Sequence, residues 1–164
     1  MKVKVKVPAT SANLGPGFDV AGLALTLYNT FTFELSEGGL NITGCPTQFC
    51  NEENLTYQAF SQAAQSCGLD FKGVNIHCES QVPYTRGLGS SSTCIVAGIV
   101  GAFAFKDKTD DRQEILELAT KIEGHPDNVA PAIFGGLTVS VMEEEQVLTL
   151  NVPVKHEYRF VALI

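Results

Sequence analysis

The chain has 164 residues, of which 45% are hydrophobic and 18% are charged. This length and composition predict one globular domain with a hydrophobic core. The formal net charge is 11 − 18 = −7, which argues against a nucleic acid or an anionic membrane as the main partner. An anionic ligand would therefore have to be held by local hydrogen-bond donors.

The cysteines indicate the cellular compartment. They are five in number and include no CxxC pair, which favours free thiols in a reducing cytoplasm over a disulfide framework or a zinc site. Cys45 and Cys50 could bridge or share a metal with His77, but the ligand spacing of a closed metal site is missing. With no signal-peptide pattern and no membrane-spanning apolar run, we expect a cytoplasmic protein.

The N-terminal part of the sequence predicts strands separated by a polar loop. Residues 2–7 alternate lysine and valine, which is the period of a half-buried strand, and Pro8 ends it. The following loop contains Asn13 and Asp19, and its simplest interpretation is a wide turn closed by side-chain hydrogen bonds. Residues 25–35 alternate again and predict a second strand or a strand pair.

The rest of the chain mixes helices and strands. Apolar residues at helical spacing, together with capping residues, predict helices over 54–67, 91–105, 111–123 and 126–134. Alternation predicts strands over 74–80, 137–142, 147–152 and 158–164. Because the last strand stops while still apolar, we expect the chain to be the first part of a longer protein.

The segment from Pro83 to Thr93 joins a predicted strand to a predicted helix and is suited to bind an anion. Gly87 and Gly89 let the backbone take positive φ and let a ligand approach closely. Ser90 to Thr93 are expected as N-cap residues, and the free N–H groups of the first helical turn would attract phosphate. The spacing matches neither GxxxxGK[ST] nor GxGxxG, so either this is another kind of phosphate loop or it is a capped turn.

Other candidate residues leave alternatives open. Glu117 lies beside the apolar stripe of its helix, where it could reach a cleft or pair with Lys121 on the surface. His125 and Asn128 lie in a corner bounded by glycine and proline, where they could act on a ligand or serve structural roles. A serine hydrolase is disfavoured because the GxSxG elbow is missing.

Three segments together resemble the homoserine kinase family of the GHMP small-molecule kinase superfamily. They are Pro8 to Asp19 (PATSANLGPGFD), Pro83 to Ser92 (PYTRGLGSSS) and Glu123 to Pro131 (EGHPDNVAP). The second segment resembles the phosphate loop of the whole superfamily, whereas the first and third favour the homoserine kinase branch. The alternatives are another GHMP kinase or a nucleotide-binding domain without catalysis.

The resemblance implies ATP-dependent phosphorylation of the L-homoserine hydroxyl, which gives O-phospho-L-homoserine for threonine biosynthesis. ATP would bind the loop residues Pro83, Arg86, Gly87, Leu88, Gly89, Ser90, Ser91 and Ser92, with Asn54 near adenine. Mg²⁺ would be held by Ser91 and Glu117. The amino acid would contact Asn13, Asp19, His125 and Asn128. The expected catalytic residues are therefore Asn128, Glu117 and Ser91.

The resemblance also implies the fold and its extent. It implies an α+β domain of the GHMP kinase N-terminal type, in which a mixed, mostly antiparallel sheet packs on helices. Residues 1–164 would form the ATP-binding domain, and the C-terminal GHMP domain would be absent, so we expect little activity from this chain alone. The expected partners are ATP and L-homoserine, without nucleic acid or membrane, and a homodimer is left open.

Overall fold

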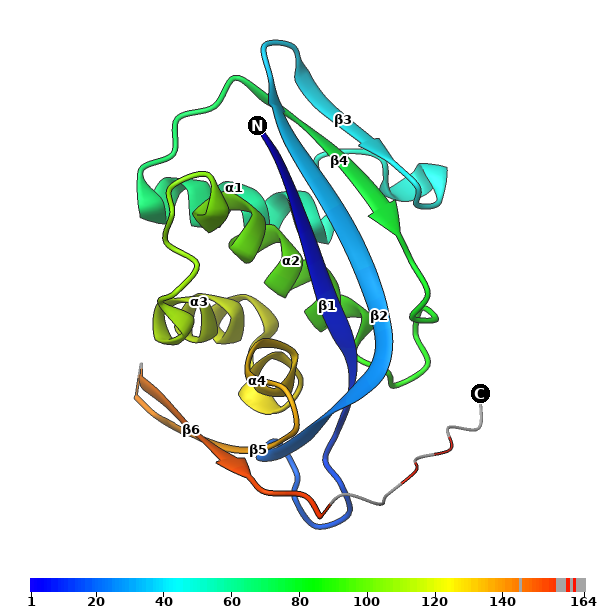
Figure 1. Cartoon of the computed structure of the whole chain (residues 1–164), viewed down its shortest axis with the longest axis vertical. Helices are drawn as coiled ribbons and strands as arrows, with labels where there is room; N and C mark the ends of the chain where they lie inside the picture. The colour runs from blue at the N-terminus through cyan, green and yellow to red at the C-terminus, as the bar shows by residue number, and fades with distance from the viewer. Residues whose placement is uncertain (145, 156–158, 160, 162–164) are drawn as a thin grey trace.

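The computed structural model describes residues 1–144, 146–155, 159 and 161. The elements follow in the order β1 (Lys2–Ala12), β2 (Ala21–Ser36), β3 (Gly39–Thr43), η1 (Thr47–Phe49), α1 (Leu55–Cys67), β4 (Gly73–Glu79), α2 (Ser90–Ala104), α3 (Arg112–Glu123), α4 (Pro126–Phe134), β5 (Leu137–Glu143) and β6 (Gln146–Val152). Helices α1 to α4 lie together on one side of the long strands β1 and β2 (Figure 1). This arrangement confirms the predicted α+β fold class.

The sheet is organised around β2, its longest strand. β1 runs antiparallel to β2, from Lys2 opposite Glu34 to Ala12 opposite Gly22. β2 also pairs antiparallel with β4 through residues 30–36 and with β5 through residues 21–23. β3 is parallel to β4, and β5 forms an antiparallel pair with β6. The sheet is therefore mixed and mostly antiparallel, as predicted.

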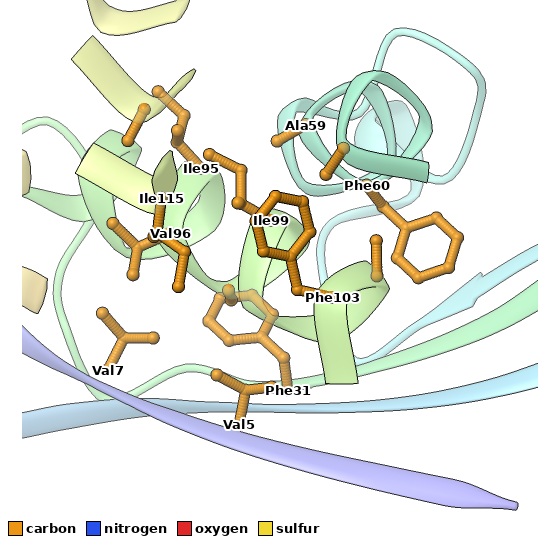
Figure 2. Packing of buried hydrophobic residues seen from close by; sticks show 14 of the residues in the cluster. Val5, Val7, Phe31, Ala59, Phe60, Ile95, Val96, Ile99, Phe103 and Ile115 are labelled. Atoms are coloured by element: carbon orange, nitrogen blue, oxygen red, sulfur yellow. The ribbon is translucent and has the colours of Figure 1, made fainter. Parts of the chain in front are cut away.

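The core lies between the sheet and the helices. In β1 the valines Val3, Val5 and Val7 are buried while the alternating lysines are exposed, so the pattern read from the sequence is confirmed. Figure 2 shows Val5, Val7 and Phe31 of the strands pointing towards side chains of α2, including Ile99 and Phe103. These side chains belong to one continuous hydrophobic cluster.

Helix α2 runs through the middle of this core and is buried around most of its circumference. Two glycines allow its close packing. A Cβ on Gly98 would collide with backbone atoms of α1 at Thr56 and Phe60, and a Cβ on Gly101 would lie 2.7 Å from the ring of Phe33. The axis of α2 is therefore fixed between α1 and the sheet.

The predicted caps at Asp111 and Gly68 are confirmed, and Asn54 is a further cap that had not been predicted. The Asn54 side chain accepts hydrogen bonds from Thr56 N and Tyr57 N, and Asp111 caps α3 through Glu114 N at 3.0 Å. Gly68 ends α1 in the left-handed conformation. Asn54 and Asp111 accept hydrogen bonds from otherwise unpaired first-turn amides, and Gly68 takes the left-handed conformation that ends a helix.

Three predictions about the strands were wrong. β1 does not end at Pro8 but continues to Ala12, because the chain stays paired with β2 across a register shift between Pro8 and Thr10. β2 begins at Ala21 and not at residue 25, since Gly22 lets the strand lie directly against the backbone of Asp127. β3 was not predicted, although Leu40 and Ile42 pair with β4, because its flanking glycines hid a short alternating pattern. The predicted strand 158–164 lies largely outside the described residues.

The hairpin of β5 and β6 turns its polar side inward. Thr138 and Ser140 are 0% and 1% exposed, whereas Val141 and Leu150 are 55% and 73% exposed. Alternation predicted these strands correctly but could not show which face would be buried.

No helix in the described ranges has the length and apolar character needed to cross a bilayer.

We predict that Gly98→Ala destabilises the domain by about 1–3 kcal/mol, since overpacking against α1 backbone atoms exceeds the gain in helix propensity. Thermal or urea denaturation measures the change. Gly38→Ala is the matched control, because a Cβ there would meet no atom within 4 Å. Equal stability of the two variants would contradict the close packing at Gly98.

Candidate functional site

The loop between β4 and α2 ends at a glycine that starts the helix. Gly89 is the N-cap residue, with φ 64° and ψ 34°, and its position supplies no side-chain cap. The prediction that the serine hydroxyls cap the helix was therefore wrong, because the left-handed glycine takes the cap position and Ser90 is already helical. The first-turn N–H groups of α2 consequently keep their capacity to bind an anion.

Gly89 lies against two polar side chains from distant segments. A Cβ at this position would collide with Thr10 Oγ1 and would lie 3.2 Å from Asn128 Oδ1. Thr10 Oγ1 donates a hydrogen bond of 2.7 Å to Asn128 Oδ1, and Thr10 N donates to Leu88 O at 3.1 Å. Strand β1, the glycine loop and α4 thus meet at one point.

Asn29 of β2 attaches the start of the same loop. Its side chain is 1% exposed, and its Oδ1 accepts hydrogen bonds from Gln81 N at 2.8 Å and Val82 N at 2.9 Å. Its Nδ2 donates to Thr93 Oγ1 at 2.9 Å, and this hydroxyl donates to Ser90 O. One amide therefore connects the beginning of the loop to the first turn of α2.

Glu123, the last residue of α3, brings a carboxylate to the serines of the loop. Its Oε1 accepts hydrogen bonds from Ser91 Oγ at 2.8 Å and from Ser92 Oγ at 3.1 Å. Ser91 is exposed and Glu123 is half-buried. A carboxylate and two hydroxyls thus lie together beside the N-terminus of α2, where a bound phosphate would also lie.

Glu117 does not have the position expected for it. Its Oε1 accepts a hydrogen bond from Gln113 Nε2 at 2.7 Å, and it faces a surface hollow lined by Met142 and Val147 near β6. Glu117 and Glu123 are six residues apart, so they differ by about 120° around the helix and about 9 Å along it. In this structure the carboxylate in contact with Ser91 is that of Glu123, and the role of Glu117 as a Mg²⁺ ligand stays a prediction.

The beginning of α4 contains a small polar cluster. Asp127 is 1% exposed, and its Oδ1 pairs with Nδ1 of His125. Its Oδ2 is buried and has no hydrogen-bond partner among the described residues. Asn128 lies beside it and accepts the hydrogen bond from Thr10. His125 and Asn128 are half-buried, so both are more accessible than Asp127.

Asn13 and Asp19 belong to an exposed turn between β1 and β2. Asn13 Oδ1 accepts a hydrogen bond of 3.0 Å from Asp19 N, and both residues have positive φ, 68° and 55°. The simple interpretation of a closed turn is thus correct for the Asn13 side chain. The Asp19 carboxylate lies at the surface of the described part of the chain. Gly22, just beyond this turn, contacts the Asp127 backbone, which places the turn near α4.

A cavity of about 300 Å³ lies next to Ser90 and Ser91. Its aromatic walls are Phe49 and Tyr84, whose ring centroids are 6.4 Å apart. Asn54 also lines it, but its Oδ1 caps α1 and its Nδ2 donates to Phe49 O at 2.8 Å. The cavity has the apolar, aromatic character of a site for a planar base. Contact of Asn54 with adenine stays a prediction.

The remaining loop residues, Leu88, Arg86 and Pro83, differ in how far they are exposed. Leu88 is buried with Ala9 and Val82 in a small hydrophobic cluster. Arg86 is exposed, and its guanidinium donates a hydrogen bond to Thr85 O at 3.2 Å. Pro83 is half-buried. Direct contacts of Pro83 and Arg86 with a nucleotide stay predictions.

The oxygen atoms at Ser91, Ser92 and Glu123 fit Mg²⁺ better than a softer metal. Mg²⁺ prefers oxygen ligands and is commonly held by one or two carboxylates together with substrate phosphates and water. In the described part of the chain, no group of three or more histidine, cysteine or acidic side chains is arranged to hold a metal ion. A metal at this point would therefore depend on phosphate oxygens for part of its coordination.

The sequence profile of the GHMP kinases N terminal domain matches residues 54–136. This range contains the glycine loop, Glu123 and the polar cluster of α4, and it covers half of the chain. The chain belongs to the GHMP kinase family. The resemblance read from the three segments is thus confirmed at the level of the family.

Individual GHMP kinases extend the match beyond the profile. The homoserine kinase of Clostridium beijerinckii is 48% identical over 163 residues, which are 99% of this chain and 55% of that protein. A solved homoserine kinase structure from Cytophaga hutchinsonii aligns with a TM-score of 0.74 and 30% identity over 93% of this chain and 52% of that one. A Listeria monocytogenes structure, named as a candidate homoserine kinase, aligns with a TM-score of 0.81 and 34% identity. The alignment covers 93% of this chain and 54% of that one. This chain spans about half the length of the relatives it matches.

Sequence reasoning missed three residues of this GHMP kinase site. Asn29 lies on the inward face of β2 with Phe31 and Phe33. A polar residue at a position that the alternation assigns to the core could have drawn attention to it. Thr10 and Glu123 lie inside the segments that carried the family resemblance, but neither was given a role. The sequence marked the two segments as important but did not single out these side chains. Their contacts become visible only in the structure, where Thr10 bonds to Asn128 and Glu123 to Ser91.

We predict that Asn29→Ala loosens the glycine loop, because Gln81 N and Val82 N would lose their acceptor. An unpaired buried donor costs about 1–3 kcal/mol. Urea denaturation measures the loss of stability, and hydrogen exchange should become faster at the Gln81 and Val82 amides.

Asn41→Ala is the control for this experiment, since Asn41 is exposed on β3. Unchanged exchange at Gln81 and Val82 in the Asn29 variant would show that Asn29 does not fix the loop.

Proposed function

We propose that the protein is a homoserine kinase, which transfers the γ-phosphoryl group of ATP to the hydroxyl of L-homoserine in the cytoplasm. The observation that carries the proposal is the meeting of Ser91, Ser92 and Glu123 at the N-terminus of α2, beside the contact of Thr10 with Asn128. The name of the 48% identical relative supports the choice of substrate within the family.

The nucleotide would lie along the glycine loop. In this proposal the first-turn amides of α2 donate to the phosphates, and the base enters the cavity between Phe49 and Tyr84. Ser91 and Glu123 would hold Mg²⁺, which offsets the negative charge of the phosphate oxygens when it is bound. Glu123 takes the role that the sequence had given to Glu117.

The amino acid would lie between the turn of Asn13 and Asp19 and the start of α4. The exposed Asp19 carboxylate suits the substrate ammonium group, and His125 suits a second polar group. Asn128 lies against Gly89 of the phosphate loop, so its amide is positioned to orient the substrate hydroxyl towards the γ-phosphorus.

The transfer is a single displacement. The homoserine oxygen forms a bond to the γ-phosphorus while the bond between this phosphorus and the β,γ-bridging oxygen breaks, and ADP leaves. Asn128 cannot accept a proton near neutral pH, so the hydroxyl proton passes to a phosphate oxygen or to water. Asp127 is buried and paired with His125, which favours a positioning role for it. Catalysis then depends on orientation and charge stabilisation.

We predict that the complete gene product releases ADP from ATP in the presence of L-homoserine, at a kcat of about 1–100 s⁻¹ as is typical of kinases. A coupled ADP assay with homoserine, mevalonate and sugars measures the preference. Faster turnover of mevalonate or a sugar would assign the protein to another GHMP kinase activity. If the protein binds ATP but phosphorylates none of these acceptors, the kinase proposal is wrong and the protein is a nucleotide-binding domain without catalysis.

We predict that Glu123→Gln lowers kcat by about 100-fold or more, since the loss of a charged oxygen ligand at the transferring phosphate removes transition-state stabilisation. Glu117→Gln on the same helix is the matched control and should keep activity near that of the parent protein. The Mg²⁺ concentration that gives half-maximal activity should rise in the Glu123 variant and stay unchanged in the Glu117 variant. The reverse ranking of the two variants would return the metal role to Glu117.

A further inference from the structure

Two cysteines lie in contact at the edge of the aromatic cavity. Cys45 Sγ and Cys50 Sγ are 3.5 Å apart. Cys50 is exposed, and Cys45 is half-buried and lines the cavity together with Phe49. A disulfide requires a sulfur separation of about 2.05 Å, so a movement of about 1.5 Å would join them.

The intervening backbone holds this pair together. The turn η1 closes through hydrogen bonds from Phe49 N to Pro46 O at 2.8 Å and from Cys50 N to Thr47 O at 3.0 Å. On the other side, Gly44 packs so closely against the Cys78 backbone that no Cβ would fit there. Cys45 is therefore anchored to β4, and the turn returns Cys50 to it.

We propose that Cys45 and Cys50 are a thiol-modification site, at which a peroxide joins the two sulfurs in a reversible disulfide and thereby weakens nucleotide binding in the adjacent cavity. The disulfide itself depends only on the two thiols, whereas its effect on nucleotide rests on the function proposed above. A reversible disulfide of this kind is typical of redox-sensing pairs in a reducing compartment.

The reaction balances with peroxide as the oxidant. The Cys50 thiolate attacks one peroxide oxygen, an S–O bond forms, the O–O bond breaks, and the leaving hydroxide takes up a proton to become water. The Cys45 sulfur then attacks Cys50 Sγ, an S–S bond forms and the S–O bond breaks. The Cys45 proton leaves with the hydroxyl group as a second water. The two thiols together lose two electrons, which reduce the peroxide.

The surroundings of the two cysteines indicate that Cys50 reacts first and Cys45 second. Burial, together with the neighbouring Cys50, raises the pKa of Cys45 to about 11, so Cys45 stays protonated near neutral pH while Cys50 is open to solvent. Burial raises the pKa of Cys78 to about 12 and also raises that of Cys94. Since the thiolate is the form that reacts with peroxide, neither of these cavity thiols competes with Cys50 in the first step. Cys45 enters only in the second step, in which its thiol condenses with the Cys50 sulfenic acid and gives its proton to the leaving hydroxyl group.

The effect on nucleotide follows from what the turn supports. Phe49 precedes Cys50 directly, forms one wall of the cavity, and accepts through its carbonyl the hydrogen bond from Asn54 Nδ2. Drawing Cys50 towards Cys45 shifts Phe49 relative to Tyr84 and disturbs the wall that would stack on the base. Loss of one such aromatic stacking contact corresponds to about tenfold in affinity.

The test uses the complete gene product treated with hydrogen peroxide and then digested under non-reducing conditions. Digestion with chymotrypsin, which can cut after Phe49 between the two cysteines, should give two fragments linked through Cys45 and Cys50. Mass spectrometry should find the linked pair lighter by two hydrogen atoms than the sum of its fragments, and dithiothreitol should separate it. Cys50→Ser should abolish this link, whereas Cys67→Ala should keep it, because Cys67 is buried at the end of α1. A link between other cysteines, or none, would overturn the proposed site.

Nucleotide affinity is measured by calorimetry with ATP and Mg²⁺ on the reduced and oxidised protein. We expect Kd to rise about tenfold on oxidation, to return after reduction, and to stay unchanged by peroxide in Cys50→Ser. Disulfide formation without a change in Kd would overturn the coupling to nucleotide. Absence of nucleotide binding by the reduced protein would refute the proposed function and the coupling together, while the peptide map would still decide the disulfide.

Discussion

The site depends on the fixed position of the N-terminus of α2. This helix is packed on nearly every side by the sheet and by its neighbours, so it cannot slide or turn without breaking the core. Its polar first turn therefore always faces the same point, and the other segments attach there. Thr10 comes from β1, Asn29 from β2, Glu123 from α3 and Asn128 from α4. The hydrophobic core thus decides where the polar chemistry can take place.

Local patterns predicted the elements because their causes are local. The alternation of Val3, Val5 and Val7, and the caps at Gly68 and Asp111, are confirmed because each depends on residues within one or two turns of chain. β3 was missed because its pairing with β4 lies about thirty residues away along the sequence. The N-cap of α2 was misplaced because a left-handed glycine and a serine are both common at that position.

The site was predictable as a set of segments and only partly as a set of residues. The three segments do meet around Gly89, and Ser91 and Asn128 lie where a phosphate and a hydroxyl could meet. The choice between Glu117 and Glu123 could not be made from the sequence, since both lie on α3 and helical periodicity does not say which neighbour each face meets. The hydrogen bonds of Glu123 to Ser91 and Ser92 are the reason for proposing Glu123 in place of Glu117. Asn29 was missed for the same reason, because its partners are more than fifty residues away.

The contact of Glu123 with the serines also explains how an acidic protein can keep a phosphate site ready. Without a ligand, the carboxylate would repel phosphate, but it is occupied by two hydroxyl donors and held in one orientation. In the proposed function, a divalent cation bound with the nucleotide would meet oxygen atoms that already lie close together, so little side-chain entropy would be lost on binding. The net charge of −7 then opposes bare phosphate more than a magnesium-bound nucleotide. If the nucleotide binds as proposed, the contact of Glu123 with Ser91 and Ser92 would therefore favour its magnesium-bound form.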